Sequence, residues 1–220
     1  MEESRVFNEV KLCHGSKGGL VLPIEPRSRK RCDFGSGFYL GDKDAQPKGL
    51  IARFPTARFY ECRLDLAGLR VKKFSEDRNG WLTWALFVAF NRGVLGVDLL
   101  RKRFSDWRYD VIIGRIADDS MMQVMNEFFD GAINDKTFIA AMKCMDLGNQ
   151  YVCKMEKACR RVQVISERSL TEEERAEALV KEQQRVRDMS SAVNEIRLKY
   201  RHDNTALYYD EILERLEHGL

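Results

Sequence analysis

Short apolar runs separated by turn-forming residues fill the first three quarters of the chain. Alternating or continuous apolar positions bounded by Gly, Pro, Asn and Asp are typical of β-strands. On this basis we expect strands at VKLCHG (10–15), GFYLG (37–41), RFYECRLDL (58–66), LRVKKF (69–74), VIIGRIA (111–117), QYVCKM (150–155) and RVQVI (161–165). Residues 16–37 hold several Gly and two Pro, which predicts a long loop before the second strand.

Helical patterns interrupt this strand series. Residues 81–90 are apolar nearly all round, which predicts a buried helix. Asp118 and Asp119 are expected to cap a Met-rich helix that stops at Gly131, and Asn134 is expected to cap another helix that runs to Met145. Because strands and helices do not alternate regularly, we predict an α+β domain over residues 1–166 rather than a doubly wound parallel sheet.

The pattern changes from residue 167 onward, which we predict to be a helical extension (167–220). Thr171 and Glu174 form a capping box before a long amphipathic helix. Its apolar positions recur at helical spacing: Leu179, Val186, Met189, Val193, Ile196 and Tyr200. Residues 202–204 should end it, and a short final helix should begin at Asn204 or Thr205. The stripe fits either packing on the body or docking of a protein partner.

Composition narrows the class of protein. No apolar run approaches the ~20 residues of a membrane span, and the charged start lacks a signal-peptide core, so we expect a cytoplasmic protein with no membrane partner. The six cysteines form no C-x-x-C pair, so we expect no metal site. The net charge of +3 divides into a basic body and an acidic tail, which would suit an anionic partner such as a dinucleotide or nucleic acid.

Three segments carry residues suited to chemistry. They are a strand ending in His14-Gly15-Ser16, an aromatic strand with Phe38 and Tyr39 after a glycine-rich loop, and Gln150 at the start of a late strand. Taken singly, each is more often structural: a histidine beside a turn, a core aromatic, a turn glutamine. Their joint presence and order carry the functional signal.

Together the segments resemble the H-Y-E signature of the ADP-ribosyltransferase superfamily, in its diphtheria-toxin and poly(ADP-ribose)-polymerase branch. A closer resemblance is to a bacterial family known as domain of unknown function 3990. It rests on CHGS (13–16), DFGSGFY (33–39), YDVIIG (109–114) with Ala117-Asp118-Asp119, and Gln150-Tyr151 with EKA (156–158). The resemblance covers residues 9–166 and implies a split pair of twisted sheets around an NAD cleft.

What the resemblance implies about the site is specific. NAD would be the substrate, and His14, Tyr39 and Gln150 would line its nicotinamide-ribose pocket. The main chain of Gly15 would pair with the carboxamide, Tyr39 would stack on nicotinamide, and His14 would bind a ribose hydroxyl. Ser16 and Phe38 belong to the same motifs. From the basic cluster 27–31, Arg31 would meet the pyrophosphate, although such a run is as often a solvated loop.

Two departures from the signature limit the reaction. Gln150 stands where the signature has Glu, and a neutral amide cannot act as a base, so polymer formation is not expected. Transfer of one ADP-ribose, NAD hydrolysis and mere NAD or ADP-ribose binding stay open. Because the side chains are nearly isosteric, a Glu at this position is expected to be tolerated. Residues 46–50 replace the family's aromatic stretch, which leaves the second wall of the pocket undefined.

The expected function is that of a bacterial toxin which attaches one ADP-ribose to a cellular protein or nucleic acid. Family resemblance further implies a separate antitoxin, and the 171–200 helix would bind it or a second copy of the chain. Rival interpretations are a non-catalytic NAD-binding or ADP-ribose-binding module and a nucleic-acid-binding protein.

Overall fold

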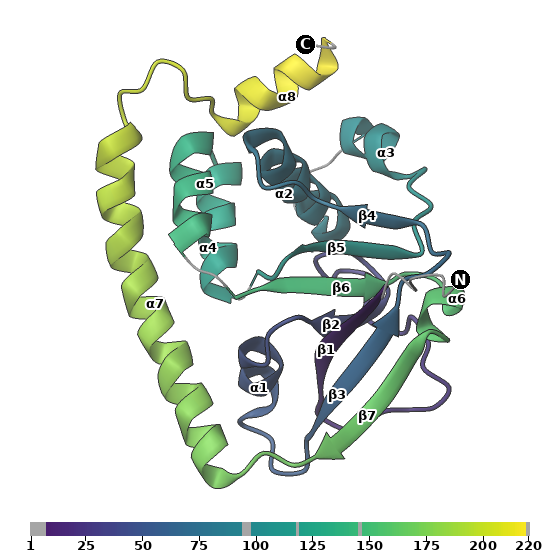
Figure 1. The fold of residues 1–220 in the computed structure, drawn as a ribbon. Helices are drawn as coiled ribbons and strands as arrows, with labels where there is room; N and C mark the ends of the chain where they lie inside the picture. Colours follow the sequence, from purple (N-terminus) through teal and green to yellow (C-terminus); the bar gives the residue numbers. More distant parts are fainter. Residues whose placement is uncertain (1–7, 94–97, 118, 145–146, 219–220) are drawn as a thin grey trace, which may run out of the picture.

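The computed structural model describes residues 8–93, 98–117, 119–144 and 147–218. Its centre is one open seven-stranded sheet with the strand order β4-β5-β6-β2-β1-β3-β7 (Figure 1). The strands are β1 (Glu9–Ser16), β2 (Phe38–Gly41), β3 (Arg58–Asp65), β4 (Val71–Lys73), β5 (Val111–Arg115), β6 (Asn149–Cys153) and β7 (Val162–Arg168). Every predicted strand is present, and the mixed α+β class is confirmed. Neighbouring strands are antiparallel except for the parallel pair β4 and β5.

The expectation of two separate sheets is wrong in one respect: the two halves are joined. β1 and β2 share one registered pair, Cys13 with Gly41, among the residues that the structure describes. On one side of this join lie β4, β5, β6 and β2, and on the other lie β1, β3 and β7. The sheet is therefore continuous by hydrogen bonding, with its weakest ladder in the middle.

Eight helices cover the sheet in the described part of the chain. They are α1 (Ala45–Ile51), α2 (Arg78–Arg92), α3 (Asp98–Phe104), α4 (Asp119–Phe129), α5 (Asp135–Cys144), α6 (Glu156–Cys159), α7 (Glu172–Tyr200) and α8 (Tyr209–Glu217). The predicted cap of α5 is confirmed, since Asn134 Oδ1 accepts from the Thr137 N–H at 2.9 Å. Asp118, the other predicted cap, lies outside the described residues. The short helices α1, α3 and α6 were not predicted, and α1 even contains Pro47 and Gly49.

The two faces of the sheet carry different cores. One core gathers residues of β5, β6, α2, α4 and α5, including Ile112, Val152 and Trp84, and we call this side the helix face. The other core gathers Leu12, Phe38 and Tyr60, covered by loop residues such as Leu20 and Ile24, and we call this side the loop face. Because side chains alternate along a strand, successive residues of β2 and β6 belong to opposite faces.

The long helix α7 begins with the predicted capping box and packs differently along its length. Toward its C-terminus, Met189 and Val193 are buried in the helix-face core. Toward its N-terminus, ion pairs join it to α1 and the turn that follows, including Lys48 with Glu174 at 3.2 Å and Arg53 with Glu182 at 3.3 Å. Val186 was predicted to be part of the apolar stripe, but it is 48% exposed. The stripe therefore packs over its C-terminal part.

The final helix begins later than predicted, at Tyr209 rather than Asn204 or Thr205. The reason is a pair of hydrogen bonds that holds the preceding segment extended. The Leu207 N–H donates to Asp135 Oδ1, and the Asp135 N–H donates to the Leu207 carbonyl, both at 2.8 Å. Since these bonds take up the main chain of Leu207, helical hydrogen bonding starts only beyond it.

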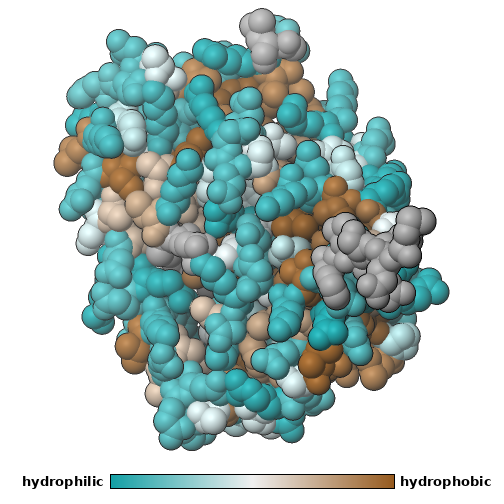
Figure 2. Space-filling model, viewed as in Figure 1, coloured by the Kyte–Doolittle hydropathy of each residue, from teal (hydrophilic) through white to brown (hydrophobic). Residues whose placement is uncertain are grey.

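The face seen in Figure 2 is mostly hydrophilic, with hydrophobic patches between polar side chains. Across the described ranges, no helix combines the length and the apolar character that crossing a membrane requires.

Close packing in the helix-face core requires glycine at position 114. A Cβ at Gly114 would lie 2.7 Å from Phe74, 2.8 Å from Phe34 and 3.0 Å from Trp84. We therefore expect Gly114→Ala to lower the free energy of unfolding by about 1–3 kcal/mol, the usual cost of overpacking a core. Urea denaturation measures this. Gly49→Ala in α1 is the control, because nothing lies within 4 Å of its added Cβ; equal stability of the two variants would contradict the packing argument.

Candidate functional site: the seam between β1 and β2

The predicted site residues meet where the pairing between β1 and β2 stops, and we call this place the seam. Continuing the register from Cys13 and Gly41 would set Gly15 directly opposite Tyr39. The two strands are not paired there. Gly15 and Tyr39 therefore flank the point at which the two halves of the sheet separate.

The direction of the main-chain groups at the seam follows from the neighbouring ladders. Beyond the end of β1, the Leu66 N–H donates to the Asn8 carbonyl, so even-numbered residues of β1 bond to β3. The N–H and C=O of Gly15 consequently point toward β2. By the same logic, the bond from the Asp42 N–H to the Asn149 carbonyl turns the main chain of Tyr39 toward β1. Two strand edges thus face each other across the seam.

His14 bridges this seam with its side chain. Its Nδ1 lies 2.7 Å from the Tyr39 carbonyl oxygen, and its ring packs 4.6 Å from that of Phe38 on the loop face. A carbonyl oxygen can only accept, so Nδ1 carries the hydrogen and Nε2 of the neutral ring is an acceptor. Burial lowers the pKa of His14, which favours that neutral form.

Helix α1 closes the helix-face side of the seam. A Cβ at Gly15 would lie 2.5 Å from the Pro47 carbonyl oxygen and 3.0 Å from Ile51 Cγ2, so only glycine fits beside α1. Leu50, in the stretch that departs from the family pattern, is 54% exposed. Residues 46–50 therefore supply packing against Gly15 and no aromatic wall.

Tyr39 projects on the helix face and is fixed by the glycine-rich loop. Its hydroxyl donates to the Gly35 carbonyl at 2.7 Å and accepts from the Phe34 N–H at 3.0 Å. Burial raises the pKa of Tyr39 well above its usual value, so the hydroxyl stays protonated. The ring is thereby held at one orientation beside the seam.

Gln150 stands in the adjacent row of the sheet, in register with Gly41 on one side and Gly114 on the other. It is 6% exposed, and its Nε2 donates to Asp33 Oδ2 at 3.2 Å and to the Arg115 carbonyl at 3.0 Å. Arg92, at the end of α2, donates to Asp33 Oδ1 through Nε at 2.8 Å. We call these three side chains the Asp33–Arg92–Gln150 cluster.

The structure thus brings four predicted residues to one region, though not to one face. The main chains of Gly15 and Tyr39 face each other, the side chains of Tyr39 and Gln150 share the helix face, and the His14 ring lies on the loop face. Ser16 closes a turn, with Oγ donating to the Gly19 carbonyl at 2.6 Å. Phe38 packs on His14. Arg31 is exposed on its loop.

Three polar residues near the seam were not predicted as site residues. Asp33 belongs to the motif DFGSG, and Arg92 at the end of α2 forms an ion pair with it. Lys154 follows β6 directly, and its Nζ donates to the Phe34 carbonyl. Burial lowers the pKa of Lys154 to about 8. No three His, Cys, Asp or Glu side chains come together to hold a metal within the described ranges.

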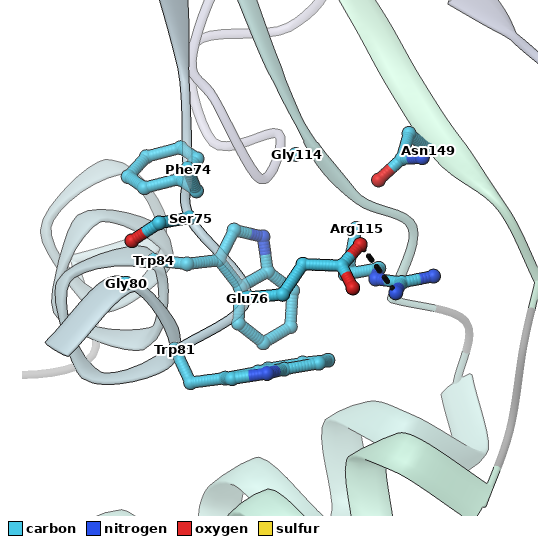
Figure 3. A pocket seen from close by; sticks show the side chains of 9 residues that line it. All are labelled: Phe74, Ser75, Glu76, Gly80, Trp81, Trp84, Gly114, Arg115 and Asn149. Carbon is cyan, nitrogen blue, oxygen red and sulfur yellow. Dashed lines mark hydrogen bonds and ion pairs between the residues drawn. The ribbon is translucent and has the colours of Figure 1, made fainter. Parts of the chain in front are cut away.

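An aromatic hollow is lined in part by Gly114 and Arg115 of β5 and by Asn149 of β6 (Figure 3). Trp81 and Trp84 line it, and their buried indole nitrogens have no hydrogen-bond partner in the described structure. Glu76 pairs with Arg115 at 2.9 Å beside it, and the Arg115 guanidinium stands 5.6 Å from the Trp81 ring. His14, Tyr39 and Gln150 are not among its lining residues.

Fold and site together define a mixed α+β protein whose central sheet separates at a seam lined by main-chain groups and one imidazole, with one buried amide in the adjacent row. The chain belongs to a family described as protein of unknown function, DUF3990, which it matches over residues 10–164. The match ends within β7 and does not include α7 or α8. Neither curated proteins nor solved structures gave a match to this chain.

The buried His14 predicts how stability depends on pH. Because its pKa is lower in the folded chain than the ordinary value of 6.5, the unfolded chain takes up the proton first as the pH falls. Stability should therefore decrease as the pH drops below about 6.5. His14→Asn keeps a donor for the Tyr39 carbonyl without a titrating ring, so its stability should fall less between pH 7 and pH 5.

Urea denaturation at several pH values measures this difference between wild type and His14→Asn. The exposed His202→Asn is the matched control for loss of one imidazole. Parallel pH curves for wild type and His14→Asn would show that His14 is not held neutral by burial.

Proposed function

We propose that this protein is an NAD-dependent mono-ADP-ribosyltransferase, which transfers one ADP-ribose to a macromolecule. The observation that supports this best is the seam. Residues from two motifs of the resemblance, more than twenty positions apart, meet there: Gly15 faces Tyr39, and His14 bonds to the Tyr39 carbonyl.

The main-chain groups of Gly15 suit a carboxamide. A primary amide carries one acceptor oxygen and an N–H donor, and the edge of a β-strand offers the complementary donor and acceptor. The nicotinamide amide would therefore add to the edge of β1 as a short strand segment does. Tyr39, held by its hydrogen bonds to Phe34 and Gly35, would supply an aromatic face nearby.

The polar side chains suit a ribose. Nε2 of neutral His14 on the loop face and Oε1 of Gln150 on the helix face are both acceptors, so they would accept from ribose hydroxyls on opposite sides of the seam. In the transfer, the bond between ribose C1′ and the nicotinamide nitrogen breaks, and nicotinamide leaves with the electron pair. A nucleophile of the target then bonds to C1′ and loses its proton. Holding the ribose in position while this charge develops accounts for the protein's contribution.

A neutral amide at position 150 favours a single transfer. Gln150 can orient the ribose, but it cannot deprotonate an acceptor hydroxyl to extend a chain. The target must therefore bring its own nucleophile. The acceptor would be a protein or a nucleic acid.

The role of a cytoplasmic bacterial toxin controlled by an antitoxin is supported by family resemblance alone. The surface for such a partner, or for a second copy, would be the outer side of α7. Val180 and Leu198 are exposed there by 65% and 74%.

A second candidate is a binding module for NAD or ADP-ribose. The observation in its favour is the same Gln150, because the site has no catalytic carboxylate at that position. A third possibility, NAD glycohydrolase activity, would use water in place of the macromolecule.

Labelled NAD incubated with the protein and a cell lysate separates these functions. We expect wild type to release nicotinamide and to label a macromolecule. Gln150→Ala should lower both by about 10-fold to 100-fold, the loss expected from removing one or two hydrogen bonds. Gln163→Ala, an exposed glutamine on β7, is the matched control and should leave both unchanged.

Each other outcome contradicts either the transferase or the role of Gln150. Nicotinamide release without labelling would identify a glycohydrolase, and NAD binding without release would identify a binding module. Full labelling by Gln150→Ala would remove this residue from the site. Nuclease and protease treatment of the labelled fraction would then show which polymer carries ADP-ribose.

A further inference from the structure

We infer that Asp33 is a positioning residue that fixes the orientation of the Gln150 amide, so that this fold requires an amide rather than a carboxylate at position 150. The orientation follows from the structure; that the oriented amide contacts a ribose rests on the proposed function.

The hydrogen-bond partners determine which way the amide faces. The nitrogen of a glutamine amide carries two hydrogens, and here two oxygens lie within reach, Asp33 Oδ2 at 3.2 Å and the Arg115 carbonyl at 3.0 Å. A carboxylate and a main-chain carbonyl can only accept. Flipping the amide would set its oxygen against both, so Nε2 has to face inward.

Asp33 is itself held in place from a third element. It lies on the loop before β2 and is 8% exposed, and Arg92 of α2 donates to its other oxygen at 2.8 Å. A buried carboxylate requires such a cation, since removing one partner leaves an uncompensated charge. The loop, α2 and β6 are therefore locked together through the Asp33–Arg92–Gln150 cluster.

With both hydrogens of Nε2 engaged, Oε1 is the group of Gln150 that remains for a ligand. No residue in the described ranges donates to it. Oε1 is an acceptor, so the class of ligand group it would take is a hydroxyl or N–H donor. Under the proposed function, a ribose hydroxyl is that donor.

The similar size of the two side chains predicts that glutamate is tolerated at position 150. The hydrogen bonds of the Gln150 amide argue against this. In Gln150→Glu, the oxygen that takes the place of Nε2 would lie about 3.2 Å from Asp33 Oδ2 and about 3.0 Å from the Arg115 carbonyl oxygen. Like charges at that distance in a buried site raise the pKa of one carboxyl strongly, and the protonated form restores a donor. Gln150→Glu should therefore be destabilised most at high pH.

Other titratable or charged side chains lie around the Asp33–Arg92–Gln150 cluster, but none of them is bonded to the Gln150 amide among the described residues. They are Cys32 on the loop, Tyr39 on β2, Arg92 on α2, Lys154 after β6 and the side chain of Arg115 on β5. Among the described residues, Asp33 and the Arg115 carbonyl are the groups bonded to the Gln150 amide. The pH response of the variant should consequently depend on Asp33.

Thermal unfolding at pH 5 and pH 8 tests the proposal. Relative to wild type, Gln150→Glu should lose on the order of 5 °C in Tm at pH 8 and clearly less at pH 5. Gln150→Ala removes the amide without adding charge, so its loss should be the same at both pH values. Gln163→Glu on β7 controls for the effect of an added surface carboxylate.

The double variant Asp33→Asn/Gln150→Glu keeps the net charge of the native cluster and exchanges the amide and the carboxylate. It should remove the excess loss of Gln150→Glu at pH 8, whereas Asp33→Asn alone should not raise Tm. Equal losses of Gln150→Glu at both pH values, or no recovery in the double variant, would overturn the inference.

An activity measurement then asks whether the oriented amide serves the proposed reaction. Nicotinamide release by folded Asp33→Asn should fall on the order of 10-fold. A wild type that releases no nicotinamide would refute the proposed function but leave the unfolding result decisive for the orientation. If Gln150→Glu shows the expected pH response but Asp33→Asn keeps full activity, Asp33 orients the amide without contributing to the reaction.

Discussion

The constraint on which the rest of the structure depends is the single registered pair between the two halves of the sheet. Cys13 and Gly41 join β1 to β2, and past them the strands do not pair. Main-chain groups left at such a point must find partners elsewhere, because unpaired groups in a protein interior are costly. The His14 imidazole satisfies the Tyr39 carbonyl, and Pro47 of α1 lies against Gly15. The local polarity of the seam follows from this incomplete pairing.

The surroundings of position 150 suit an amide. Both neighbours of Gln150 across the sheet are glycines, which leaves room for its side chain to reach Asp33 of the loop and the Arg115 carbonyl of β5. One of those groups is the Asp33 carboxylate, paired with Arg92. A negative charge already occupies this part of the site, so a neutral donor beside it costs less electrostatically than a second carboxylate would. The amide and Asp33 are best understood as a pair.

The sequence predicted the strands well, because each is a short apolar run with turn residues at both ends. It also singled out the loop DFGSG and the positions His14, Tyr39 and Gln150. It could not show that His14 and Tyr39 meet through a main-chain carbonyl, since that contact depends on where the β1–β2 register stops. Nor could it show α1, which contains Pro47 and Gly49 and gains its stability from packing on Gly15. Long-range pairs such as Asp33 with Gln150 lie 117 positions apart and leave no local pattern.

The helix α7 compensates for the weak ladder at the seam, although it lies beyond the residues that the family match covers. Its first turns bond to α1 on the half that contains β1 and β3: Lys48 pairs with Glu174, and Arg175 donates to the Pro55 carbonyl at 2.8 Å. Its last turns bury Met189 and Val193 against α4 and α5 on the other half (Figure 1). A 29-residue helix is stiff along its axis, so fixing both of its ends fixes the two halves relative to each other. The contact with α1 includes ion pairs, whereas the contact with α4 and α5 is apolar. Salt would therefore weaken the attachment to α1 sooner than the attachment to α4 and α5, and the part of the seam nearest Gly15 depends on the weaker of the two.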